Sequence, residues 1–136
     1  MFRLAAILLF SCVAIATNLG CGGSQPYPVG DVSGKLTLRG KPAPADLEIF
    51  FMSQKTGAAY KAAIGADGAF AVEEPVRVGE YVAYVQPAVD LNMDMSAPPK
   101  PVSVNSSVPK KYSNDSQSDL LASVQEGKND FQFDMK

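Results

Sequence analysis

Cys21 is the residue of this chain whose type and surroundings best suit a defined chemistry. It follows an apolar stretch without charges, Gly20 precedes it, and the small, flexible run Gly22–Ser24 comes after it. The cysteine sulfur is a good nucleophile, and cysteines beside membrane segments are common sites of acylation. The sequence therefore predicts a lipid attachment at Cys21, which would hold the following residues at a membrane surface.

The residues before Cys21 predict a secretion signal. Arg3 and the amino terminus supply positive charge, and Leu4–Ala16 is apolar apart from Ser11. As a helix this run would be about 20 Å long, at about 1.5 Å per residue, which is short of the ~30 Å hydrocarbon core of a bilayer. Residues 1–20 are therefore expected to be a signal peptide rather than a permanent span.

The site resembles the bacterial lipobox, in which the cysteine becomes the acylated first residue of the mature protein. Gly20 fits that pattern, whereas Leu19 stands one place late and Asn18 occupies the position usual for leucine. Two alternatives stay open: cleavage after the A-x-A site Ala14–Ala16 would release a soluble secreted protein, and an uncleaved segment would remain as an anchor. The main expectation is a cell-envelope protein, lipid-anchored to the outer membrane or to the periplasmic face of the inner membrane.

Histidine is absent from the chain, and Cys21 is the only cysteine after the predicted signal peptide. With Cys21 acylated, zinc sites built on histidine or cysteine and Ser-His-Asp or Cys-His nucleophiles are excluded. The chain has 12 Lys+Arg against 14 Asp+Glu, so a nucleic-acid partner is not expected. We expect no enzyme activity, no cofactor and no metal, and a fold stabilised by packing rather than by disulfides.

The residues after the predicted signal peptide are enough for one domain with a modest core. Residues 21–31 are rich in Gly and Pro and predict a flexible tether. Residues 32–136 contain short apolar stretches separated by turn signals and no long helical pattern, which indicates an all-β domain. Within it, residues 87–118 contain five prolines and predict a long loop that Pro109–Tyr112 closes.

Alternation of apolar and polar residues predicts seven strands and an immunoglobulin-like sandwich. Leu47–Met52 is the most apolar, and Glu48 is its only charge, so it is expected at the centre of a sheet. Asp67-Gly68 predicts a hairpin because this pair tolerates positive φ, and residues 126–129 predict a second hairpin between the last two strands. The expected strands are 31–38, 47–52, 58–64, 69–73, 81–86, 120–124 and 130–135.

Several segments, in order, resemble the carboxypeptidase regulatory-like (transthyretin-like) domain carried by many small bacterial lipoproteins. The resemblance covers Val32 to Lys136 and implies a seven-stranded sandwich that acts as a non-catalytic binding or structural module. Hydroxyisourate hydrolases of this fold depend on histidines, so the resemblance does not imply that activity here. The segments that carry it are Val32–Thr37 with Gly40–Pro42, Asp67–Phe70, Val78–Tyr81, Pro109–Tyr112 and Gly127–Phe133.

Tyrosines are the remaining candidates for contact with a ligand. The alternative function is an envelope-attached carbohydrate-binding module, with Tyr84 and Tyr112 as the candidate contacts, because aromatic rings offer flat apolar faces to sugar rings. A weaker third alternative is an enzyme that uses carboxylates on the long loop. The expected partners are a membrane, through the lipid, and an envelope protein or polysaccharide.

Asp90, Asn92 and Asp94 place oxygen ligands at every second position, as in a calcium loop. Met95 stands where an EF-hand needs glycine, and Pro101 stands where it needs glutamate. A solvated polar loop is therefore the expected interpretation of this segment.

Overall fold

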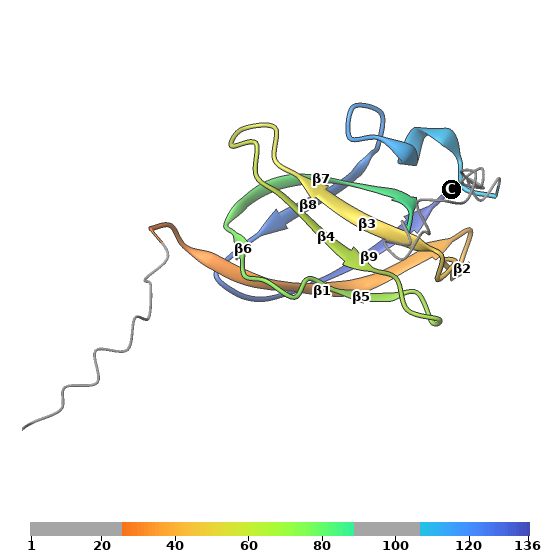
Figure 1. Cartoon of the computed structure of the whole chain (residues 1–136), viewed down its shortest axis with the longest axis horizontal. Coiled ribbons are helices and arrows are strands. Elements are labelled where there is room, and N and C mark those ends of the chain that lie inside the picture. Colours follow the sequence, from red (N-terminus) through yellow and green to blue (C-terminus); the bar gives the residue numbers. More distant parts are fainter. Residues whose placement is uncertain (1–25, 89–106) are drawn as a thin grey trace, which may run out of the picture.

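Figure 1 shows the fold in a computed structural model, which describes residues 26–88 and 107–136. The predicted signal peptide, Cys21 and residues 89–106 of the long loop lie outside the described residues. The described residues form two β-sheets and one short 3₁₀ turn, η1 (Lys110–Ser113). The prediction of an all-β sandwich is confirmed.

One sheet is built around β1 (Val29–Leu38), which has partners along both of its edges. On one edge, β9 (Gly127–Met135) runs parallel to it through nine paired positions, from Gly30–Gly127 to Leu38–Met135. On the other edge, three short antiparallel strands follow one another along β1. These are β6 (Val76–Arg77), β5 (Ala69–Ala71) and β2 (Lys41–Pro42).

The second sheet has the antiparallel order β4-β3-β7-β8. The central position expected for Leu47–Met52 is confirmed, because β3 lies between β4 and β7 and turns Leu47, Ile49 and Phe51 into the core. The bounds of the four strands are β3 (Leu47–Met52), β4 (Ala59–Ala63), β7 (Gly79–Pro87) and β8 (Leu120–Val124).

The prediction of seven strands is wrong, since the described residues form nine. The two additional strands, β2 and β6, have two residues each, and both pair with β1. A two-residue strand has no alternation of its own to detect. Such strands exist here because the long edge of β1 offers unpaired backbone groups to any segment that passes it.

The predictions of two hairpins are wrong, because at both turns the chain passes from one sheet to the other. The tight turn at Asp67-Gly68 forms, with Gly68 at a φ of 79°, but β4 belongs to one sheet and β5 to the other. The turn after Val124 likewise connects β8 of one sheet to β9 of the other. Because the chain crosses between sheets at these turns, the strands on both sides keep their apolar residues in the same core.

Aromatic rings from both sheets meet in the core. The ring centroid of Phe51, on β3, lies 5.8 Å from that of Phe70 and 6.4 Å from that of Phe133, which belong to β5 and β9. Aromatic pairs at such separations contribute about 0.5–1.5 kcal/mol beyond the burial of their area. These three rings therefore hold the two sheets face to face.

Gly34 allows β9 and the Phe70 ring to approach β1 closely. A Cβ at this position would overlap the carbonyl oxygen of Phe131 and lie 2.8 Å from the Phe70 ring. The first neighbour is paired backbone, and Phe70 is buried in the core. Neither can give way without disturbing the packing of the sheets.

We therefore expect Gly34→Ala to lower the free energy of unfolding by roughly 1–3 kcal/mol, the usual cost of overpacking. Urea unfolding would measure the change. Ser33→Ala is the matched control, because Ser33 is the exposed neighbour on the same strand and is expected to stay within about 0.5 kcal/mol of wild type. Equal stabilities of the two variants would contradict the role of Gly34.

Candidate functional site

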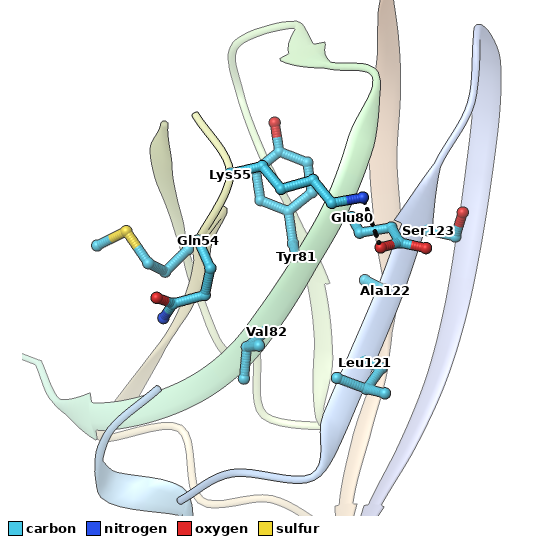
Figure 2. Close-up of a pocket in the computed structure, with 9 residues that line it drawn as sticks. Gln54, Lys55, Glu80, Tyr81, Val82, Leu121, Ala122 and Ser123 are labelled. Carbon is cyan, nitrogen blue, oxygen red and sulfur yellow. Dashed lines mark hydrogen bonds and ion pairs between the residues drawn. The ribbon is translucent and has the colours of Figure 1, made fainter. Parts of the chain in front are cut away.

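A groove of about 360 Å³ lies on the outer face of the β4-β3-β7-β8 sheet. Figure 2 shows that its walls come from the end of β3 and the loop after it, from the start of β7, and from β8. This volume suits a small ligand or an inserted side chain. The lining residues are Met52, Gln54, Lys55, Glu80, Tyr81, Val82, Leu121, Ala122 and Ser123.

The strand register places three apolar side chains of the groove in one row. Met52 pairs with Val82, and Val82 pairs with Leu121, so the three lie across neighbouring strands on the same face. Leu121 ends the row because β8 is the edge strand, and its residue surface is 71% exposed. We call this set the Met52–Leu121 row; it gives the groove an apolar floor that opens toward the edge of the sheet.

An ion pair borders the groove on its polar side. The Lys55 ammonium lies 3.3 Å from a carboxylate oxygen of Glu80, and Figure 2 shows the contact along the rim. Both side chains are largely exposed, so the pair contributes little to stability. Its effect is to leave the rim without net charge.

Tyr84 lies on the same outer face, beside the Met52–Leu121 row. Phe50 and Tyr84 are register partners, and their rings stack with centroids 5.3 Å apart and planes 17° from parallel. Burial, helped by the charge of Asp115, raises the pKa of Tyr84, so its hydroxyl stays neutral and can donate a hydrogen bond. The ligand contact predicted for Tyr84 stays a prediction, and the ring is partly exposed on the outer face.

Tyr112 occupies a different environment. It belongs to η1, is only 1% exposed, and its hydroxyl accepts a hydrogen bond from the backbone N–H of Lys136 at 3.0 Å. Tyr84 and Tyr112 therefore do not share an exposed surface. The ligand contact predicted for Tyr112 stays a prediction, and in this structure the residue packs in the core.

Three carboxylates, those of Glu48, Glu73 and Glu74, line a second pocket of about 690 Å³ together with Lys61. Glu48 is already paired with Lys61, at 3.1 Å. Across residues 26–88 and 107–136, no group of three or more Asp, Glu, His or Cys side chains could hold a metal ion. In the same part of the chain, no helix has the length and apolar character needed to cross a membrane.

Tyr27 and Arg77 fix the point at which the chain enters the sandwich. The Arg77 guanidinium carbon lies 4.6 Å from the centroid of the Tyr27 ring, a cation–π distance. Arg77 is itself held by its backbone, because its N–H donates to the Tyr60 hydroxyl and its carbonyl accepts from the Tyr81 hydroxyl. The first described residues are therefore bound to β6, six residues after Cys21.

No protein-family model, curated protein or solved structure matches the chain. The candidate site therefore rests on the geometry of the described residues. The resemblance to the carboxypeptidase regulatory-like domain remains an interpretation of the sequence.

Burial, followed by the neighbouring Tyr60, raises the pKa of Tyr81 to about 12. The folded chain favours the neutral phenol, so the contribution of Tyr81 to stability is complete below about pH 10 and is lost as the pH rises from about 10 to about 12. An ultraviolet absorbance titration should show one tyrosine ionising near pH 12. That step should disappear in Tyr81→Phe and persist in Tyr84→Phe, and its presence in both variants would contradict the assignment.

Proposed function

We propose that this chain is a cell-envelope lipoprotein, anchored to a membrane through Cys21, whose sandwich is a non-catalytic binding module. The groove on the β4-β3-β7-β8 sheet is its binding surface. The observation that carries the proposal is the Met52–Leu121 row, which leaves apolar surface open to water beside a neutral rim. Covering such surface is favourable in proportion to its area, so a bound partner would be stabilised there.

The entry point of the chain supports anchoring through a short tether. Tyr27 is six positions after Cys21, so extended chain spans at most about 20 Å between the two residues. A lipid at Cys21 would therefore keep the β6 end of the sandwich near the membrane. Figure 1 places the carboxyl terminus at the other end of the sandwich, near β2.

The resemblance to the carboxypeptidase regulatory-like domain supports the same proposal. Its segments fall on connected parts of the sandwich: Val32–Thr37 lies in β1, Val78–Tyr81 leads into β7, and Gly127–Phe133 lies in β9. Domains of this kind serve larger proteins as accessory modules, which agrees with a binding rather than a catalytic role.

The anchor is tested by mass spectrometry of the mature protein from the membrane fraction. We expect Cys21 at the amino terminus, carrying acyl chains, because two or more chains give stable anchoring. Cys21→Ala should move the protein out of the membrane fraction. An unmodified mature chain that begins at Thr17 would contradict the anchor and support soluble secretion.

The binding surface is tested by a photo-crosslinking amino acid placed at Lys55 in the intact, membrane-attached protein. The same probe at Lys35 is the matched control, because Lys35 is an exposed lysine on the outer face of the other sheet. We expect adducts with a different envelope component from position 55 and not from position 35. Equal labelling, or none, at the two positions would contradict the assignment of the groove.

A carbohydrate ligand is the second candidate, and the stacked Phe50–Tyr84 pair is the observation that favours it. In that case the intact protein would be retained on purified envelope polysaccharide, and Tyr84→Ala would abolish the retention. Retention that Tyr84→Ala does not change would count against this alternative.

A further inference from the structure

β8 lacks the features that keep most edge strands from pairing with another chain. Edge strands are commonly short, charged or interrupted by proline. β8 has five residues, Leu120–Val124, with neither charge nor proline. By contrast, β4 carries Lys61, β9 carries three charged residues, and β5 and β6 have only three and two residues.

The backbone of β8 has hydrogen-bonding groups directed away from β7. The N–H and C=O of Gln125, just after the strand, bond to the side chain of Asn129 on β9, at 2.9 and 2.8 Å. Because backbone groups alternate in direction along a strand, Leu121 and Ser123 direct theirs to the same side as Gln125. Among the described residues, no strand pairs with that side of β8.

Leu121 adds an apolar side chain to this open edge. It is the exposed large hydrophobic residue of the described chain, and it ends the Met52–Leu121 row. If Leu121 of a second copy stood opposite it, the row would continue through that copy's own Val82 and Met52. A continuous row would then cross both sheets.

The charges around β8 favour a neutral partner. One exposed ion pair, Lys55–Glu80, lies beside the Ser123 end of the strand, and another, Lys111–Asp119, lies before Leu120. Each pair is neutral in itself, with N–O distances of 3.3 and 2.9 Å. The edge therefore offers no net charge to attract a charged peptide or to repel an identical strand.

We propose that β8 is the docking edge for a second copy of this chain. The two β8 strands pair antiparallel about a two-fold axis at Leu121, which joins the two four-stranded sheets into one of eight strands. A two-fold interface of this kind uses the same surface on both copies. The proposal does not depend on the lipid: when both copies are anchored in one membrane, the joined sheet lies along its surface, because antiparallel pairing directs the two tethers to opposite ends.

Single cysteines on β8 test the register of the pairing in the full-length protein. Leu121→Cys should form a disulfide-linked dimer under mild oxidation, because residues facing each other across antiparallel strands come within disulfide distance. Ser123→Cys is the matched control: it lies on the same face, but its counterpart in the second copy is four residues further along. The parent chain gives the background from Cys21.

The proposal expects at least a tenfold higher yield of dimer for Leu121→Cys than for Ser123→Cys. Equal yields, or none above background for Leu121→Cys, would overturn it. Acylation of Cys21 is read separately from the mass of the same samples, so loss of the dimer and loss of the anchor are distinguishable.

A charge at the edge gives a second readout without added thiols. Native mass spectrometry of the detergent-extracted protein should show dimer in wild type and monomer in Leu121→Asp. Leu121→Asp should still unfold in one cooperative thermal transition, because Leu121 is exposed and its loss leaves the core intact. Persistence of the dimer in Leu121→Asp would overturn the proposal, and a monomeric wild type that still labels other proteins from Lys55 would assign the edge to a different partner.

Discussion

The parallel pairing of β1 with β9 is the interaction on which the rest of the structure depends. It joins residues nearly a hundred positions apart, such as Thr37 and Phe133, and it brings the first and last strands of the described chain together. Closing so long a loop costs conformational entropy, which only a long, well-packed pairing offsets. The other edge of β1 pairs with β2, β5 and β6, so every strand of this sheet is hydrogen-bonded to β1. Gly34 is a point at which this packing is tight, because Phe131 and Phe70 occupy the space that a side chain would need.

Local patterns in the sequence predicted the strands well and their partners poorly. Leu47–Met52 and Leu120–Val124 have the expected bounds, because alternation along a strand is a property of the strand itself. The turn at Asp67-Gly68 also formed, but its chemistry fixes only the backbone of the turn and not the sheet that each flanking strand joins. β2 and β6 depend on β1 being present beside them, so no pattern within their own residues could reveal them.

The candidate site shows the same division. The outward direction of Tyr84 follows from its place between the inward residues Ala83 and Val85, and the structure places it on the outer face. The Met52–Leu121 row could not be predicted, because its residues come from three strands and meet only through the register of the sheet. The one available signal was an apolar residue on the outward side of a short strand, Leu121 in LLASV. Tyr112 shows the opposite case, since a tyrosine beside two lysines looks exposed in sequence and yet is buried.

The attachment of Tyr27 to Arg77 has a mechanical consequence. A force applied to the residues before Val29 is directed along β1, so the nine pairs with β9 are loaded together, in shear, rather than opened one after another. A force on β8 from the side would instead peel a five-residue strand from β7, one pair at a time. The sandwich should therefore resist force applied along β1 and yield more easily to force applied sideways on β8. Traction on the chain entry would load β1, whereas the proposed docking would use β8.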